Sequence, residues 1–95
     1  MSEISKVYQE IAAFGKKYSA QKIILFGSRA RGTNQKKSDI DIAIYGCSQF
    51  NELEYALQEE LWCLLPLDII NMDGNVSDDL IKEIERDGKI IYEKI

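Results

Sequence analysis

The hydrophobic residues of the chain change their spacing along its length, and each change predicts a new element. Apolar residues recur at helical spacing over residues 2–18 and again over about 49–64, where Pro66 is expected to end the helix. A third helix is expected to stop at Gly88. Its candidate N-cap residues are Asn75, Ser77 and Asp78.

Four shorter runs have the length and the β-branched or alternating composition of strands. They cover residues 22–26, 39–45, 67–72 and 89–93. The order of helices and strands predicts an α/β (α+β) fold, in which helices flank a small mixed sheet of about four strands. The loop of residues 27–38 is too short for an ordinary crossover helix, so the first two strands are expected to be antiparallel neighbours.

Composition limits the class of protein. The 95 residues are 45% hydrophobic and 29% charged, which predicts one globular domain over residues 1–95. No apolar run approaches the roughly 20 residues that cross a membrane, and the first segment lacks a signal-peptide pattern, so we expect a cytoplasmic protein. Cys47 and Cys63 are then expected to be reduced, buried thiols.

The chain is acidic as a whole but basic in one segment. A net charge of −4 argues against nucleic acid as the main partner, because phosphate binding draws on a basic surface. Between residues 22 and 37, however, there is no acid, and the basic residues are Lys22, Arg29, Arg31, Lys36 and Lys37. A local positive field in an acidic protein suits a small polyanion.

Aspartates are the first candidates for chemistry. Asp39 and Asp41 alternate with isoleucines, so they share a strand face about 6.5–7 Å apart, and a solvated face is the ordinary explanation of such a pair taken alone. Asp68 is expected to be buried within the apolar run PLDII, where a carboxylate needs a partner. Converging carboxylates repel one another unless a cation joins them, and the absence of histidine favours Mg²⁺ or Mn²⁺ over zinc.

Gly27 and Ser28 follow the first strand in a way that suits an anion. Glycine lets the backbone approach a ligand closely, and the following amides and the serine hydroxyl can point at a phosphate. A plain turn at the end of a strand is the alternative interpretation. The stretch GSRARGT is not a Walker P-loop, because Thr33 and Asn34 stand where that motif requires lysine and then serine or threonine.

Taken together, Gly27-Ser28, ten intervening residues and Asp39-x-Asp41 resemble the signature of the DNA polymerase β-like nucleotidyltransferase superfamily. The fuller string GSRARGTNQKKSDID resembles that of its minimal branch, the MNT domains of bacteria and archaea. The detailed match covers residues 23–45. It implies a mixed sheet flanked by helices, binding of ATP with Mg²⁺, and transfer of a nucleoside monophosphate to an acceptor with release of pyrophosphate.

The resemblance also implies roles for single residues. Asp39 and Asp41 would bind the metal ions that hold the triphosphate. Asp68 would be the third catalytic carboxylate, a metal ligand that helps to deprotonate the acceptor hydroxyl, while the nearby Asp73 is expected to make a turn. The candidates for binding the nucleotide phosphates are Gly27, Ser28 and Arg29, with Arg31 as the alternative arginine.

The resemblance finally implies where the acceptor comes from. Relatives that modify antibiotics or tRNA carry a further domain that grips the acceptor, and we expect none in this chain. An MNT domain of this kind resembles the antitoxin of a HEPN/MNT toxin–antitoxin pair, which transfers AMP to a tyrosine of the HEPN toxin. Two alternatives stay open: an antitoxin that acts by occlusion, and a stand-alone small-molecule nucleotidyltransferase that forms a homo-oligomer through Phe50, Tyr55 or Trp62.

Overall fold

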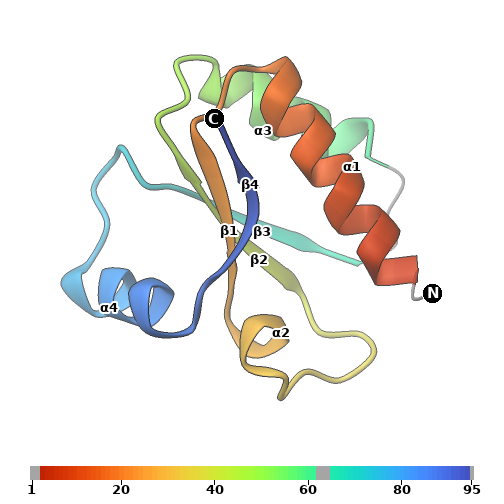
Figure 1. Cartoon of the computed structure of the whole chain (residues 1–95), viewed down its shortest axis with the longest axis vertical. Coiled ribbons are helices and arrows are strands. Elements are labelled where there is room, and N and C mark those ends of the chain that lie inside the picture. The colour runs from red at the N-terminus through yellow and green to blue at the C-terminus, as the bar shows by residue number, and fades with distance from the viewer. Residues whose placement is uncertain (1–2, 62–64, 95) are drawn as a thin grey trace.

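A four-stranded sheet with helices on both faces makes up the fold (Figure 1). The computed structural model describes residues 3–61 and 65–94. In chain order the elements are α1 (Glu3–Lys17), β1 (Lys22–Phe26), α2 (Ser28–Arg31), β2 (Ile40–Tyr45), α3 (Phe50–Glu59), β3 (Leu67–Asn71), α4 (Asp78–Asp87) and β4 (Lys89–Glu93). The predicted fold class is confirmed, and each strand lies within one residue of its predicted bounds.

The strands lie in the order β3-β2-β1-β4. β1 runs antiparallel to β2 and to β4, whereas β2 and β3 are parallel and are connected through α3. The mixed sheet and the antiparallel pairing of the first two strands are thus as predicted. In the register of the sheet, Phe26 pairs with Asp41, and Asp41 pairs with Asp68. The end of β1 therefore lies beside the beginnings of β2 and β3.

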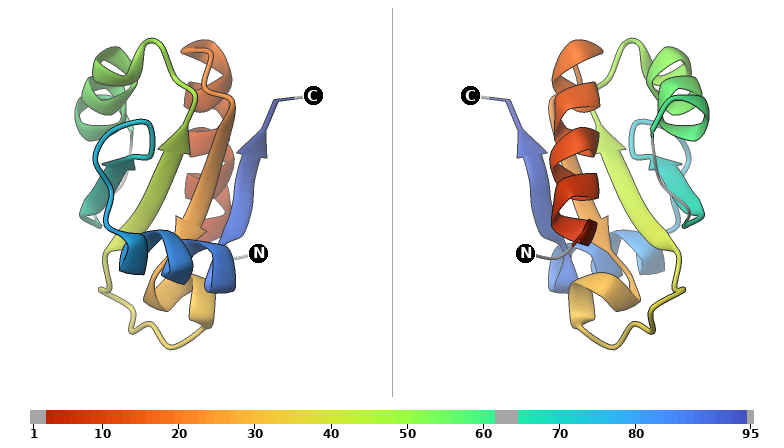
Figure 2. Two further views of the ribbon diagram at one scale, coloured as in Figure 1. Left: turned by 90° about the vertical axis from the view of Figure 1, so that its left-hand side faces the viewer. Right: turned by 90° about the vertical axis from the view of Figure 1, so that its right-hand side faces the viewer.

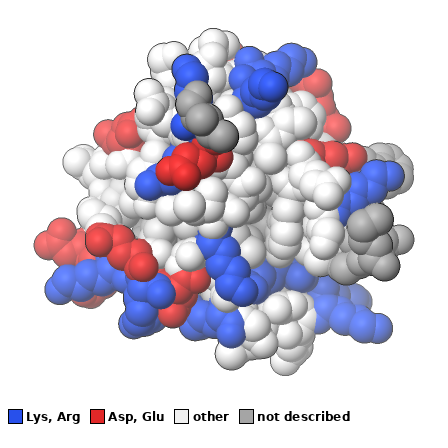
Figure 3. All heavy atoms as spheres, in the orientation of Figure 1, with Lys and Arg blue, Asp and Glu red and all other residues white. Residues whose placement is uncertain are grey.

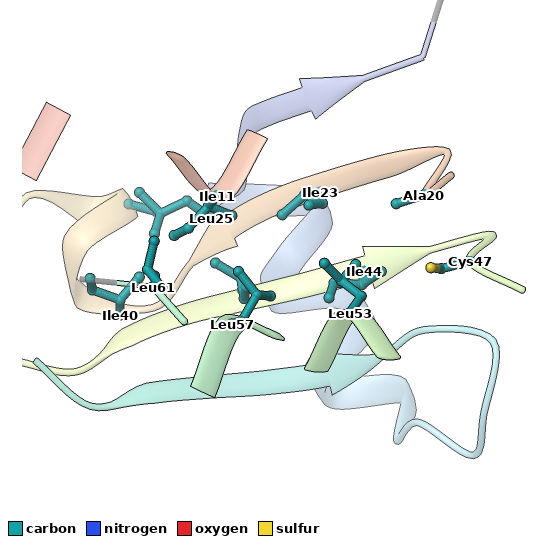
Figure 4. Close-up of a cluster of buried hydrophobic side chains, with 12 residues drawn as sticks. Ile11, Ala20, Ile23, Leu25, Ile40, Ile44, Cys47, Leu53, Leu57 and Leu61 are labelled. Carbon is teal, nitrogen blue, oxygen red and sulfur yellow. The ribbon is translucent and has the colours of Figure 1, made fainter. Parts of the chain in front are cut away.

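The main core lies between the sheet and the pair of helices α1 and α3 (Figure 4). Ile40, Ile42 and Ile44 alternate along β2, and each is fully buried on this face. Burying a side chain of this size contributes about 1.5–3 kcal/mol. The residues between them, including Asp41, belong to the opposite face, where α4 crosses the sheet near one end of the strands (Figure 2). Because side chains alternate along β2, its core isoleucines and the candidate site residue Asp41 lie on opposite faces of the sheet.

Two local features differ from what the sequence predicts. A single helical turn, α2, occupies the start of the segment that we expected to be a loop. The helix α3 ends at Glu59, earlier than the proline at which it was predicted to stop. The amides of Glu60 and Leu61 both donate to the carbonyl of Ala56, at 2.8 and 3.2 Å, and this shared acceptor breaks the regular hydrogen-bond ladder.

Side-chain hydrogen bonds secure the beginning of α4 and the far ends of β2 and β3. Ser77 is the N-cap of α4, and its hydroxyl accepts a hydrogen bond from the amide of Leu80 at 3.3 Å. The carboxylate of Asp73 accepts from the amides of Gly46 and Cys47, at 3.1 and 3.3 Å. Asp73 therefore has a structural role after β3, at the end of the sheet away from the other aspartates.

The remaining expectations concern the cysteines, the candidate interface residues and the membrane. Cys47 is buried with a free thiol, as predicted, whereas Cys63 and Trp62 lie outside the described residues. Phe50 packs against the main core, and Tyr55 is 66% exposed. Within residues 3–61 and 65–94, every helix is too short or too polar to cross a bilayer.

Candidate functional site

The turn after β1 brings a glycine against a carboxylate. Gly27 has φ +76° and ψ −157°, a conformation that L side chains rarely adopt, and its carbonyl accepts from the amides of Ala30 and Arg31 at 3.1 Å each. Phe26 pairs with Asp41 across the sheet, so the next residue lies beside the Asp41 side chain. A Cβ atom on Gly27 would overlap Oδ2 of Asp41. Both the backbone angle and the close approach require glycine here.

The strand register places Asp41 and Asp68 on one face at one end of the sheet, directly after Asp39. Asp41 and Asp68 are paired residues of the parallel strands β2 and β3, so their side chains project to the same side, and the two strands are about 4.8 Å apart. Asp39 lies just before β2, and its carboxylate is near enough to raise the pKa of Asp41. The aspartates that the sequence singled out therefore lie at the same end of the sheet, where their charges act on one another.

The arrangement of these carboxylates is more open than the sequence suggests. Asp68 is exposed, because β3 is an edge strand, and the expectation that it is buried among isoleucines is wrong. Asp39 is exposed as well, and Asp41 is half-buried. Among the described residues, no group of three acidic, histidine or cysteine side chains is close enough to hold a metal ion as it stands. Like charges that have access to water lower their repulsion by remaining apart.

Asp41 is the site carboxylate whose pKa is shifted by its surroundings. Burial raises the pKa of Asp41 above its ordinary value, and the carboxylates of Asp68 and Asp39 raise it further. The more distant Glu83 acts in the same direction, and Arg31 partly offsets the increase. The donors are carboxylate oxygens alone, which are the ligands that Mg²⁺ and Mn²⁺ prefer, so the residues present fit a divalent cation of this kind.

An ion pair between α2 and α4 adds a charged group, Glu83, that the sequence analysis did not assign to the site. Nη1 of Arg31, in α2, lies 3.5 Å from Oε2 of Glu83, in α4, and this ion pair borders the carboxylate face. The sequence left Arg31 as an alternative and gave Glu83 no role. The two are 52 residues apart, and Glu83 resembles any acid on the solvated face of a helix, so only the tertiary structure relates them.

The loop after α2 uses the guanidinium of Arg29. Its Nε donates to the carbonyl of Ser38 at 3.1 Å, and its Nη2 donates to the carbonyl of Lys36 at 3.0 Å. The side chains of Lys36 and Lys37 are exposed. In Figure 3, Lys and Arg side chains gather along the lower edge of the molecule, where Figure 1 shows α2 and this loop. The hydroxyl of Ser28 makes no hydrogen bond within the described part of the chain.

The raised pKa of Asp41 predicts a pH-dependent loss of stability. The folded protein binds this proton more tightly than the unfolded chain does, so the stabilisation is present below the ordinary value of 3.8 and is lost as the pH rises through the folded pKa. Asp41→Asn is therefore expected to raise the Tm at pH 7.5, because it removes a charge that is partly buried and lies near the carboxylates of Asp68 and Asp39.

Thermal unfolding in EDTA between pH 3.5 and pH 7.5 tests this prediction. The difference in Tm between Asp41→Asn and the wild type is expected to shrink toward pH 3.5, as Asp41 takes up its proton and loses its charge. An Asn variant that is no more stable than the wild type at pH 7.5 contradicts the electrostatic interpretation.

Comparisons with known proteins agree with this architecture. A family model described as "Polymerase beta, Nucleotidyltransferase" matches residues 9–95. A search of curated proteins found no match.

Three solved structures share the fold at 21–24% identity. A toxin–antitoxin complex with AMP-PNP gives a TM-score of 0.68 at 24% identity, covering 92% of this chain and 73% of that one. A mutant of the toxin–antitoxin MntA-HpeT gives a TM-score of 0.71 at 22% identity, with 92% of this chain and 73% of that one covered. The complex of the tri-AMPylated Shewanella oneidensis HEPN toxin with MNT antitoxin gives a TM-score of 0.65 at 21% identity. It covers 95% of this chain and 73% of that one.

Proposed function

The chain belongs to the polymerase β nucleotidyltransferase family, and we propose that it transfers AMP from ATP to a tyrosine hydroxyl of a HEPN-type toxin, which it thereby neutralises in the cytoplasm. The observation that carries the proposal is the register of the sheet: Asp41 lies beside Asp68 and against Gly27, so the acidic groups and the glycine turn form one site. Residues 1–95 would act as a single minimal nucleotidyltransferase domain.

The acidic face supplies the ligands for divalent metal. Asp39, Asp41 and Asp68 would hold Mg²⁺, with Mn²⁺ as a substitute, because they offer only hard oxygen donors. When bound, the metal ions would neutralise charge on the triphosphate and stabilise the in-line displacement. The raised pKa of Asp41 supports this assignment, because crowded carboxylates without a counter-ion are a poor arrangement for stability and a good one for binding a cation.

The turn after β1 would bind the phosphates. Gly27 leaves the backbone accessible, and the hydroxyl of Ser28 is free for a β- or γ-phosphate oxygen. Arg29 was predicted to bind nucleotide, but two of its donor groups are already used by loop carbonyls. The exposed Arg31 is the better source of additional positive charge for the phosphates.

The proposed chemical step moves one AMP unit. The tyrosine oxygen attacks the α-phosphorus, the bond from that phosphorus to the oxygen bridging to the β-phosphate breaks, and pyrophosphate leaves. Asp68 accepts the proton of the tyrosine hydroxyl. Its exposure on an edge strand supports this role, because an acceptor on the surface of another protein can reach it. The solved structures with this fold include complexes with a toxin, one of them tri-AMPylated, and this supports the choice of acceptor.

Incubation with labelled ATP tests the proposal. The purified chain is incubated with Mg²⁺, α-labelled ATP and the product of the adjacent gene. If that product is the toxin, it is expected to be labelled on a tyrosine, and EDTA is expected to prevent labelling. Label on a small metabolite but not on the toxin would support the small-molecule alternative. Failure to label either acceptor, with neutralisation intact, would support the antitoxin that acts by occlusion.

A further inference from the structure

We propose that Arg29 is a positioning residue that fixes the loop of residues 34–38 and thereby holds Asp39 beside Asp41. The inference rests on the proposed function, in which Asp39 is a metal ligand. It differs from the phosphate-binding role that the sequence predicts for Arg29, because the guanidinium acts through Asp39 and does not touch the nucleotide.

Arg29 joins α2 to the loop at two points. Its Nε and Nη2 groups donate to the carbonyls of Ser38 and Lys36, at 3.1 and 3.0 Å. A guanidinium presents these N–H groups in a rigid plane, so it can hold two carbonyls at a fixed separation. The base of the side chain is also fixed, because Arg29 is half-buried and the next residue, Ala30, is only 5% exposed. Arg29 is therefore a firm anchor for the loop.

The loop itself is a small closed turn. The amide of Gln35 donates to the hydroxyl of Ser38 at 2.8 Å, and the amide of Ser38 donates to the carbonyl of Gln35 at 3.2 Å. In the part of the chain that the structure describes, the hydrogen bonds that connect residues 34–38 to the rest of the protein are the two that Arg29 donates. Without Arg29, the turn would move as a unit.

Asp39 lies between this turn and the start of β2. On one side, Ile40 is fully buried and its amide donates to the carbonyl of Pro66 at 2.9 Å. On the other side, Ser38 is held by Arg29. The Asp39 side chain is exposed and forms no hydrogen bond within the described residues, so its backbone decides where the carboxylate points. Releasing Ser38 removes one of the two constraints on that backbone.

Two substitutions separate positioning from phosphate binding. Arg29→Lys keeps the positive charge but loses the planar pair of donors, whereas Arg29→Ala loses both. If Arg29 acts by position, both variants are expected to lower kcat by about 10- to 100-fold, the usual cost of removing a group that orients a metal ligand. KM for ATP is expected to stay within about twofold, because ground-state contacts with the nucleotide are retained.

The matched control is Lys37→Ala. It removes one positive charge from the same loop, at an exposed side chain that forms no hydrogen bond within the described residues. Its kcat and KM are expected to equal those of the wild type. Calorimetry with Mg²⁺ and a non-hydrolysable ATP analogue gives a second measurement, in which both Arg29 variants are expected to bind Mg²⁺ more weakly than Lys37→Ala does.

Amide hydrogen exchange tests the tether without any turnover. The amides of Gln35 and Ser38, which are hydrogen-bonded within the turn, are expected to exchange faster in both Arg29 variants, while those of β2 remain protected. Unchanged exchange would overturn the proposal, as would an Arg29→Lys variant that keeps wild-type kcat while Arg29→Ala raises KM, the pattern of a phosphate contact. The two proposals can fail separately. If exchange shows that Arg29 holds the loop but the folded wild type transfers no AMP, the proposed function is refuted and the positioning role of Arg29 is supported.

Discussion

Asp41→Asn is expected to lower the rate of AMP transfer by about 10³-fold or more while leaving the protein folded. Asp41 lies at the centre of the site: it contacts Gly27, and its strand pairs with that of Asp68. Asparagine keeps the shape of the side chain but carries no charge to neutralise a divalent cation, so the loss falls on the transfer step. The rate is measured with labelled ATP at saturating Mg²⁺, and folding is measured by circular dichroism.

The control for this prediction is Glu93→Gln. Glu93 is exposed at the end of β4 and pairs with Lys22, at the opposite end of β1 from the glycine turn. Removing its charge is expected to leave the rate unchanged. An Asp41→Asn protein that retains more than about a tenth of the wild-type rate would falsify the assignment of Asp41 as a metal ligand.

The double substitution Asp39→Ala and Asp41→Ala extends the test to cells. If the chain neutralises its toxin by AMP transfer, cells that produce the toxin and this variant are expected to stop growing, although the variant folds and is as abundant as the wild type. Continued growth would mean that neutralisation does not need the carboxylates, as expected for an antitoxin that acts by occlusion.

Gly27→Ala is expected to reduce transfer by more than about 100-fold and to cost about 1–3 kcal/mol of stability. Two effects add: alanine is strained at φ +76°, and its Cβ overlaps Oδ2 of Asp41. The overlap is relieved only if the Asp41 carboxylate or the turn moves, and either movement disrupts the site. Thermal unfolding measures the stability loss, with ~4–8 °C in Tm for each kcal/mol in a domain of this size.

Gly32→Ala separates these two effects. Gly32 has nearly the same backbone angle, φ +79°, but nothing lies within 4 Å of the Cβ that would be added. Gly32→Ala is therefore expected to lower stability through backbone strain and to leave the rate of AMP transfer unchanged. Combining Gly27→Ala with Asp41→Ala removes the overlap, so the double variant is expected to be more stable than the sum of the single effects predicts. Strict additivity would show that Gly27 and Asp41 do not contact each other.

Elements that carry their own local signal could be predicted from the sequence. β1 and β4 were predicted at their observed bounds, because each is a short β-rich run next to a glycine. The turn α2 was not, since the four residues SRAR contain one apolar residue and no hydrophobic period. The predicted end of α3 was wrong, because the apolar spacing continues past Glu59 whereas the regular helical hydrogen bonds end there.

The site could be predicted only in part, because spacing specifies neighbours along one strand and says nothing of the next strand. Asp39 and Asp41 followed from alternation, but the pairing of Asp41 with Asp68 depends on the register of two parallel strands joined by a helix. The exposure of Asp68 depends on the position of β3 at the edge. The carbonyls that Arg29 contacts are seven and nine residues away, and no sequence pattern identifies them.

The position of β4 in the sheet determines when this domain can become functional during synthesis. β1 leads into Gly27 and is flanked by β2 on one side and by β4 on the other. Ribosomes add ~5–20 residues per second, so β1 waits on the order of several seconds before its second neighbour has been translated. Through that interval the nascent chain has an open strand edge, which is a site for mispairing. The sheet can be completed only after Glu93 has left the exit tunnel, because β4 is the last of its strands to be translated and covers the open edge of β1.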